Sequence, residues 1–204
     1  MEKGIALLSG GIDSPVAISI MQERLDIIAV HFHQKPLTEE KEVDKVKELT
    51  KMLKLKKVYL IPFVKVFKQL VEKCNHKNYF ILSKIAMFQT AEIIAKKEQA
   101  KFLVTGENLA QVSSQTLSNL ATISKNSKLE ILRPLLTKDK QEIIDFAKEL
   151  GTYNISKGPE ICNLLGPKHP ATSSDPKKIT EELEKADLKE LIEESLNNAE
   201  VLIL

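Results

Sequence analysis

The stretch Ser9-Gly10-Gly11-Ile12-Asp13-Ser14 determines how the N-terminal part of this chain is expected to fold. It follows an apolar run over residues 5–8 and precedes a segment with helical character. Glycines allow the backbone to approach a ligand closely, and successive N–H groups in such a turn form a concave site for oxygen atoms. The helix behind the turn adds the positive end of its dipole. The stretch therefore predicts a phosphate or pyrophosphate site near the N-terminus.

Ser14 and Pro15 extend this prediction to the start of the helix. Serine is a favoured N-cap and proline is favoured at the first helical position, so we expect Ser14 to cap this helix. The loop has neither the spacing of a Walker loop nor the G-x-G-x-x-G fingerprint. A turn that binds no ligand is the simpler alternative, but the strand, the turn chemistry and the cap together favour the anion site.

Short apolar runs alternate with longer segments of helical periodicity. The expected strands are residues 5–8, 27–32, 57–61, 102–104 and 129–132, with an edge strand over residues 201–204. The expected helices include one capped by Thr38, a buried one over Tyr79–Ala95, and one that starts at Asp139 and ends at Gly151. This alternation predicts an α/β fold with a Rossmann-like parallel sheet and helices on both faces. In such a sheet the loops after Leu8, Phe32 and Val104 meet at one edge, where ligands bind.

The C-terminal part of the chain differs in composition. Residues 156–176 are rich in Gly, Pro, Ser and Thr and predict a long loop, and loops of this length are usually functional. An amphipathic helical stretch follows Asp175-Pro176. We expect residues 1–155 to form the main domain, and residues 156–204 to form a cysteine-bearing loop and a helical extension packed on that same domain.

Composition excludes several classes of protein. The chain has 204 residues, of which 43% are hydrophobic, enough for a core of its own. Its two cysteines, Cys74 and Cys162, exclude a disulfide scaffold. No run approaches the roughly 18 apolar residues that span a bilayer, and the N-terminus has no secretory pattern, so a cytoplasmic protein without a membrane role is expected. The 30 basic and 28 acidic residues are too balanced to predict strong nucleic-acid binding by charge alone.

Further motifs lie at the expected ends of the other strands. They are Val30-His31-Phe32-His33, residues 105–117 (TGENLAQVSSQTL), Arg133-Pro134-Leu135-Leu136 with Asp139-Lys140, Pro159-Glu160-Ile161-Cys162 and residues 166–172 (GPKHPAT). The loop over residues 9–14 resembles the PP-loop of ATP pyrophosphatases. With the other motifs it resembles the catalytic domain of the ThiI family of tRNA 4-thiouridine synthetases, over about residues 5–194. The resemblance implies an adenine nucleotide alpha-hydrolase-like fold and an ATP-dependent tRNA sulfurtransferase. In that family ATP adenylates a uridine carbonyl oxygen, and a cysteine persulfide supplies the sulfur.

The resemblance also implies which residues contact the nucleotide. They are Leu7, Leu8, Ser9, Gly10, Gly11, Ile12, Asp13, Ser14, His31, Phe32, Lys84, Gly106 and Gln115. Lys84 stands where the family has an arginine, so it keeps the charge and loses the bidentate fork. Asp13 is the expected ligand of a magnesium ion (Mg²⁺) that the ATP phosphates also hold.

Several of these positions carry physical arguments of their own. His31 and Phe32 can flank an adenine, and Gln115 offers donors and an acceptor to a base edge or a ribose. A side chain at Gly106 is expected to block a nucleotide that lies across the sheet edge. The simpler alternatives are a core Phe32, a His31 bonded to backbone and a Gln115 amide on a helix face, while Asp139 is expected only to cap its helix.

The two cysteines lie in different contexts. Cys162 precedes Lys168 and His169 in the long loop, and cationic neighbours favour the reactive thiolate. The family's catalytic cysteine falls at this position, and a buried structural thiol is the alternative. Some relatives carry C-x-x-C at Cys74 and hold an iron–sulfur cluster there, but Lys77 replaces the second cysteine here. Cys74 is therefore interpreted as a cluster ligand, a catalytic redox partner of Cys162, or a bystander.

The chain begins with the strand that precedes the loop over residues 9–14, whereas full-length family members first carry an RNA-binding THUMP region, and many end in a rhodanese domain. We therefore expect tRNA to reach this chain through a separate THUMP-type protein or an oligomer, with a sulfur donor such as a cysteine desulfurase. Three hypotheses follow: a tRNA sulfurtransferase, an adenylating ligase or sulfurtransferase acting on a small molecule, and a non-catalytic nucleotide-binding module. The retained loop, Gln115 and Cys162 favour an enzyme.

Overall fold

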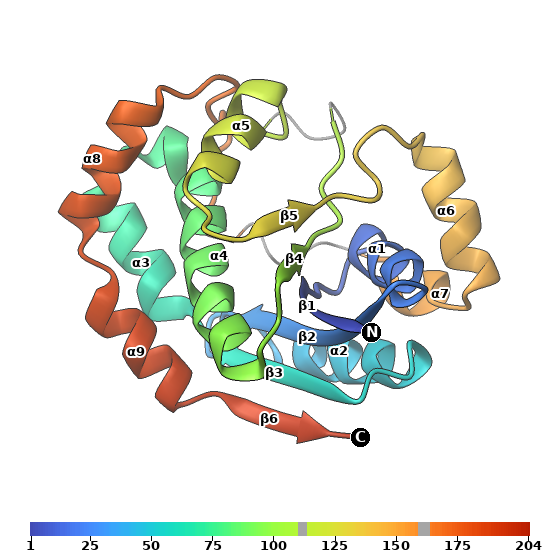
Figure 1. The fold of residues 1–204 in the computed structure, drawn as a ribbon. Helices are drawn as coiled ribbons and strands as arrows, with labels where there is room; N and C mark the ends of the chain where they lie inside the picture. Colours follow the sequence, from blue (N-terminus) through green and yellow to red (C-terminus); the bar gives the residue numbers. More distant parts are fainter. Residues whose placement is uncertain (110–113, 159–163) are drawn as a thin grey trace.

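Strands and helices alternate along the chain in the computed structural model, which describes residues 1–109, 114–158 and 164–204 (Figure 1). The strands are β1 (Glu2–Leu7), β2 (Leu25–His33), β3 (Lys57–Pro62), β4 (Phe102–Val104), β5 (Glu130–Leu132) and β6 (Glu200–Ile203). The helices are α1 (Asp13–Gln22), α2 (Glu40–Met52), α3 (Val64–Lys73), the short 3₁₀ turn η1 (His76–Asn78), α4 (Tyr79–Glu98), α5 (Leu117–Lys125), α6 (Lys140–Glu149), α7 (Tyr153–Ser156), α8 (Pro176–Ala186) and α9 (Lys189–Asn197). All six expected strands are present, with ends that lie within three residues of those expected.

The sheet has the strand order β5-β4-β1-β2-β3-β6. Strands β1 to β5 are parallel, and β6 pairs antiparallel with β3. From β1 the chain first builds outward through β2 and β3 and then crosses to the other side to build β4 and β5. The strand order therefore reverses between β1 and β4, which is the place where open α/β sheets bind ligands.

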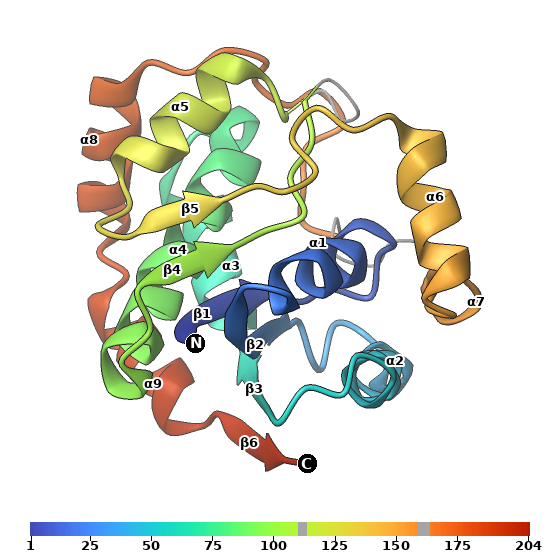
Figure 2. The same cartoon turned by 45° about the vertical axis from the view of Figure 1, so that its right-hand side comes forward.

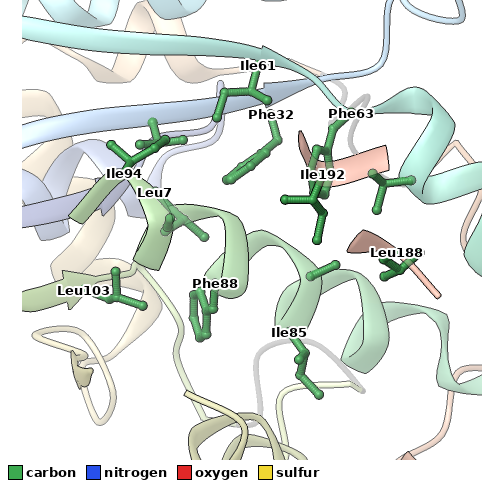
Figure 3. Close-up of a cluster of buried hydrophobic side chains, with 14 of the residues drawn as sticks. Leu7, Phe32, Ile61, Phe63, Ile85, Phe88, Ile94, Leu103, Leu188 and Ile192 are labelled. Atoms are coloured by element: carbon green, nitrogen blue, oxygen red, sulfur yellow. The ribbon is translucent and has the colours of Figure 1, made fainter. Parts of the chain in front are cut away.

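Helices cover both faces of this sheet, as the sequence predicts (Figure 2). Because successive side chains of a strand point to opposite faces, Leu7 packs toward α3, α4, α8 and α9, whereas its neighbour Ala6 packs toward α1 and α2. In Figure 3, Phe32 and Ile61 of the sheet lie opposite Phe88 of α4, with Ile192 of α9 beside them. The C-terminal helices thus contribute to the same core as the sheet, and the α/β fold with a mostly parallel sheet is confirmed.

Helix α6 begins and ends as its sequence predicts. Asp139 accepts a hydrogen bond from the backbone N–H of Gln141 at 2.7 Å, and Glu142 accepts one from the N–H of Asp139 at 2.8 Å, which completes a capping box. Gly151 follows the helix with φ of +76°, the left-handed conformation that favours glycine after a helix. These local signals place α6 because its ends depend on near neighbours in the sequence.

The two other predicted caps are wrong. Helix α2 has Glu39 as its N-cap, without a side-chain cap bond, and Thr38 lies buried just before it. Helix α1 begins at Asp13, two residues earlier than a Ser14 cap predicts, with Ile12 at the N-cap position and Pro15 as the third helical residue. The hydroxyl of Ser14 bonds back to Ser9 instead of capping the helix, so a tertiary contact overrides the local preference.

No helix within residues 1–109, 114–158 and 164–204 combines the length and apolar character needed to cross a bilayer.

The packing of α9 against the shared core predicts that the C-terminal extension unfolds together with the sheet. Ile192 is 5% exposed, so Ile192→Ala should lower the free energy of unfolding by about 2–4 kcal/mol in a single transition. Ile203 of β6 is 81% exposed, and Ile203→Ala is the matched control with little effect. Urea titration followed by circular dichroism measures both; a separate early transition for the extension would contradict a single domain.

Candidate functional site

A cleft of about 460 Å³ lies at the carboxyl ends of β1, β2 and β4. Twelve of the residues predicted from the sequence line it: Leu7, Leu8, Ser9, Gly10, Gly11, Asp13, Ser14, His31, Phe32, Lys84, Gly106 and Gln115. Ile12 is not among the lining residues, because its side chain packs beside Val16 and Leu135 in a small apolar cluster against α6. Cys74 lies away from the cleft, and Cys162 falls outside the described residues. The fold thus brings three separate loops to one place.

Two serines close the loop between β1 and α1 on itself. The backbone N–H of Ser9 donates to Oγ of Ser14 at 2.9 Å, and the two hydroxyl oxygens lie 3.1 Å apart. The N–H of Gly11 points back to Oγ of Ser9 at 3.3 Å. Since α1 has no side-chain cap, the N–H groups of its first turn keep their capacity to bind an anion at the cleft.

The backbone of Gly106 lies against the first turn of α1. A Cβ atom built on Gly106 would lie 2.8 Å from the carbonyl carbon of Asp13 and 2.8 Å from the nitrogen of Ser14. Both contacts are with backbone, which has no room to move aside. The sequence argument found the right residue for a different reason, because a side chain here would first meet α1 rather than a nucleotide.

A buried carboxylate organises the charged side of the cleft. Glu107 is 3% exposed and accepts a hydrogen bond from Nε of Arg133 at 2.8 Å, while Nζ of Lys84 lies 3.8 Å from its other oxygen. Nearer the loop, Nζ of Lys140 donates to Asp13 at 2.7 Å. Sequence reasoning did not propose Glu107 as a site residue and left Lys140 without a role. The signal was available, because both residues lie in motifs that directly follow strands.

His31 is held as a neutral ring with one free acceptor. Its Nδ1 bonds the carbonyl oxygen of Leu8 at 2.9 Å, which requires the proton to be on Nδ1. Burial lowers the pKa of His31 to about 4, against a smaller opposing effect of that hydrogen bond. Within the described part of the chain, Nε2 is buried without a hydrogen-bond partner. The cleft therefore presents a buried acceptor that a ligand N–H or O–H can satisfy.

The opposite half of the cleft is apolar. Phe32 is 8% exposed and packs on Phe63 with ring centroids 4.7 Å apart, yet it also lines the cleft. Other apolar lining residues are Phe67, Tyr79, Phe80, Ile81, Met87, Leu120 and Ile123. Flat and apolar walls of this kind suit a planar base. Phe32 is therefore both a core residue and a wall of the cleft, so the two sequence interpretations are compatible.

Gln115 fixes the loop that follows β4. Its Oε1 accepts a hydrogen bond from the N–H of Asn108 at 2.8 Å, and the Asn108 side chain donates to the carbonyl oxygens of Leu135 and Lys138, each at 2.7 Å. Gln115 precedes α5, whose N-cap is Thr116, so its amide does not lie on a helix face. Gln115 thus holds Asn108, whose side chain joins the loop after β4 to the loop after β5.

Cys74 has the surroundings of an unreactive thiol. Its Sγ donates to the carbonyl oxygen of Glu182 at 3.4 Å. Partial burial, and next the negative charge of Glu182, raise its pKa to about 11, so the thiol stays protonated at neutral pH. His76 instead bonds the carbonyl oxygen of Leu165 at 2.7 Å. Across the described ranges no three His, Cys, Asp or Glu side chains gather as metal ligands. These surroundings favour the bystander interpretation over a cluster ligand.

Asp13 follows the loop glycines and lines the cleft, and this arrangement fits magnesium that is also held by a bound ligand. Magnesium is commonly held by one or two carboxylates together with substrate phosphates. The ammonium of Lys140 lies on the same carboxylate and would share it with the ion. The donor set is thus consistent with magnesium that arrives with a nucleotide.

The segments on either side of residues 159–163 are held at the cleft by separate contacts. Nζ of Lys45 donates to the carbonyl oxygen of Ser156 at 3.0 Å. Downstream, the N–H of Ala171 donates to the carbonyl oxygen of Lys77 at 2.8 Å, and Gly166 lies against the ring of Phe80. Both ends of the segment that carries Cys162 in the sequence are therefore anchored to elements that line or border the cleft.

Comparison with known proteins identifies the relatives of the chain. A family model described as the thiamine biosynthesis protein ThiI matches residues 1–188. A probable tRNA sulfurtransferase of Acetivibrio thermocellus is 39% identical over 209 residues, covering 99% of this chain and 53% of the relative. A probable tRNA sulfurtransferase of Staphylococcus epidermidis is 40% identical over 210 residues, covering 99% of this chain and 51% of the relative. The chain thus spans about half the length of the curated relatives it matches.

Solved structures show a similarity to the same kind of protein. A 4-thiouridine synthetase in complex with RNA and ATP superposes with a TM-score of 0.93 and 37% sequence identity, over 100% of this chain and 55% of that chain. The NMN synthetase of Francisella tularensis superposes with a TM-score of 0.58 at 16% identity, over 92% of this chain and 86% of that chain, and shows a shared fold.

The contact at Gly106 gives the first prediction for the site. Gly106→Ala should push the loop after β4 off α1, lower the free energy of unfolding by about 1–3 kcal/mol, and weaken ATP binding at least tenfold, by about 1.4 kcal/mol. Gly4→Ala is the control, because its Cβ would meet only side-chain methyl groups, at 3.0 Å and beyond. Calorimetric titration with ATP and magnesium, beside thermal unfolding, measures both effects. Unchanged ATP affinity in Gly106→Ala would contradict the prediction.

His31 gives a prediction on pH. The unfolded chain takes up a proton on this ring below about pH 6.5, whereas the folded chain does so only near pH 4. The free energy of unfolding should therefore be unaffected above pH 6.5 and decline between pH 6.5 and 4, with His31 accounting for roughly 3 kcal/mol.

Urea unfolding of wild type and His31→Asn at pH 7.5 and 4.5 measures this decline. The variant should lose less stability on acidification than the wild type. Burial also lowers the pKa of His33 to about 4, so His31→Asn should keep the part of the stability loss that His33 causes. His33→Asn is the companion variant that measures this part. Equal losses in wild type and His31→Asn would show that the ring is not held neutral.

Proposed function

The chain belongs to the ThiI family, and we propose that it forms the ATP-dependent catalytic part of a tRNA sulfurtransferase that makes 4-thiouridine. One observation carries the proposal. The anion-binding loop, the buried acceptor of His31 and the charged group around Glu107 converge on a single cleft. ATP has an adenine, a ribose and a charged phosphate chain, and the loop, the His31 acceptor and the charged group can contact these parts. The relatives named tRNA sulfurtransferase and the ATP-bound 4-thiouridine synthetase support the same function.

ATP binding follows from the chemistry of the walls. The N–H groups of Ser9–Ser14 and of the first turn of α1 would hold the β- and γ-phosphates. The adenine would lie against Phe32, and its exocyclic amino group would donate to Nε2 of His31, the acceptor that has no partner among the described residues. Asp13 would hold Mg²⁺ together with the phosphates, and the ion would offset negative charge on the departing pyrophosphate.

Adenylation would proceed at the α-phosphorus. The O4 atom of the target uridine attacks this phosphorus while N3 of the uridine loses its proton to solvent. The bond from the α-phosphorus to the bridging oxygen breaks, and pyrophosphate leaves with the electron pair. The backbone N–H groups of the loop and the ammonium of Lys140 stabilise the charge that develops on the leaving group. Because these donors are already held in place, they require little reorganisation during the reaction.

Sulfur transfer would use Cys162 as the persulfide carrier. The terminal sulfur of the persulfide attacks C4 of the uridine, AMP leaves with the former O4, and a C4–S–S–Cys162 disulfide results. A dithiol reductant then cleaves the S–S bond in two exchange steps and leaves as a disulfide, so that 4-thiouridine and a Cys162 thiol are released. The raised pKa of Cys74 makes it a poor thiolate for that cleavage, so we assign the resolving thiol to another molecule.

Partners follow from the same function. We propose that a THUMP-type RNA-binding region or an oligomer presents the tRNA, since the net charge of +2 on this chain supplies little attraction to RNA. A cysteine desulfurase would load the persulfide, and the reaction would take place in the cytoplasm with tRNA. We further propose that residues 156–204 belong to the same domain as residues 1–155 and bring the sulfur-bearing segment to the cleft.

The proposed division of labour predicts a separable defect. Cys162→Ala should abolish 4-thiouridine in tRNA and leave ATP–pyrophosphate exchange intact, because adenylation needs no thiol. Cys74→Ala is the matched control and should keep both activities. Exchange measured with and without tRNA distinguishes the substrate. Strong exchange that ignores tRNA would favour an adenylating enzyme with a small-molecule acceptor, and normal thiouridine in Cys162→Ala would refute the sulfur carrier.

A further inference from the structure

Lys45 of α2 lies over the anion-binding loop although it comes from a different part of the chain. It lines the cleft and is half-buried. A Cβ built on Gly10 would lie 3.1 Å from Cδ of Lys45 and 3.8 Å from its Nζ. The ammonium is therefore beside the first glycine of the loop, where the loop N–H groups gather.

The carbonyl of Ser156 holds this ammonium in place. Nζ of Lys45 donates to it at 3.0 Å, and none of the ion pairs within the described ranges involves Lys45. An ammonium has three N–H donors, so one hydrogen bond to a neutral carbonyl leaves two donors and the full positive charge. Such a group is suited to an additional, negatively charged partner.

A second and independent observation points to a ligand at the same place. Ser156 is 3% exposed, it lines the cleft, and its Oγ has no hydrogen-bond partner among the described residues. A buried hydroxyl without a partner is costly, so native proteins usually satisfy it. An oxygen of a bound ligand would accept a hydrogen bond from this hydroxyl and lie next to the ammonium of Lys45.

The charge of this wall favours an anion. Lys41, Lys45 and Lys157 line the cleft together, and Glu42 is the acidic side chain among them. Nζ of Lys41 lies 3.3 Å from a carboxylate oxygen of Glu39, so the excess of positive charge at this wall comes from Lys45 and Lys157 against Glu42. The wall faces the loop from the side opposite to the Asp13–Lys140 pair, since Lys45 reaches Gly10 from α2 and Lys140 reaches Asp13 from α6.

We propose that Lys45, assisted by Ser156, is a further catalytic residue that contacts the terminal phosphates of ATP and neutralises the pyrophosphate as it leaves. This inference rests on the proposed function and adds to it the cation that grips the leaving group from the α2 side. Lys45 acts on the β- and γ-phosphates and makes no contact with the AMP part. The two parts of the nucleotide are therefore bound by separable groups.

Equilibrium binding of ATP, AMP and inorganic pyrophosphate to the full chain, with magnesium, tests the proposal. Lys45→Met keeps most of the side-chain volume and removes the charge. It should weaken ATP and pyrophosphate binding about tenfold to a hundredfold, as expected for a lost hydrogen bond to a charged group, and leave AMP binding unchanged. Lys45→Gln can still donate to Ser156 and should show the same loss, whereas Lys45→Arg should restore most of the affinity.

Lys51→Met is the matched control, because Lys51 lies on the same helix, is exposed and does not line the cleft. Thermal unfolding of each variant shows that it folds, and Lys45→Gln serves if Lys45→Met does not fold. Equal weakening of ATP and AMP, or no weakening of ATP and pyrophosphate, would overturn the role of Lys45. A wild-type chain that binds no ATP would instead overturn the proposed function itself.

Discussion

The contact between Gly106 and the first turn of α1 is the constraint on which the site depends. At this point the loop after β4 touches the backbone of Asp13 and Ser14, with no space for even one additional carbon atom. The contact fixes how far the second half of the sheet lies from the anion-binding loop. Because Glu107 directly follows Gly106, the same contact also determines where the Glu107 carboxylate and its cations lie at the cleft. A protein interior as dense as this transmits a small displacement directly.

Glu107 at the cleft is paired with two cations, Arg133 and Lys84. Glu107 is almost fully buried, and a lone carboxylate there would be strongly destabilising. Arg133 from the end of β5 provides the hydrogen bond that makes its burial tolerable, and Lys84 of α4 approaches from the other side. Nζ of Lys84 lies 3.8 Å from Oε1 of this carboxylate. The buried carboxylate of Glu107 thus holds the ammonium of Lys84 at the cleft.

The sequence predicted the fold and the anion-binding loop from the alternation of apolar runs and helical segments, whereas the resemblance to the ThiI family implied most of the other residues of the cleft. Buried parallel strands are short apolar runs, and their carboxyl ends meet wherever the helices are placed, so the loops after Leu8, Phe32 and Val104 could be assigned to one edge. The cap of α6 was predictable because Asp139 and Glu142 bond to near neighbours. The caps at Ser14 and Thr38 were not, because Ser14 bonds to Ser9 across the loop and Thr38 is buried by tertiary packing. Glu107 and Lys140 lie in motifs that follow strands, but their charged partners, and the position of Lys45 beside the loop, come from distant parts of the sequence.

Leu8 joins the two halves of the cleft through its own peptide groups. Its N–H donates to the carbonyl oxygen of Val30, and its carbonyl oxygen accepts from the ring of His31, both at 2.9 Å. Leu8, which directly precedes the anion-binding loop, is thus hydrogen-bonded to β2, the strand that carries His31. These two hydrogen bonds keep the anion-binding loop and the His31 ring at a fixed separation. The cleft is consequently expected to select ligands by length, because a flat ring and a charged group must lie at the matching distance from each other.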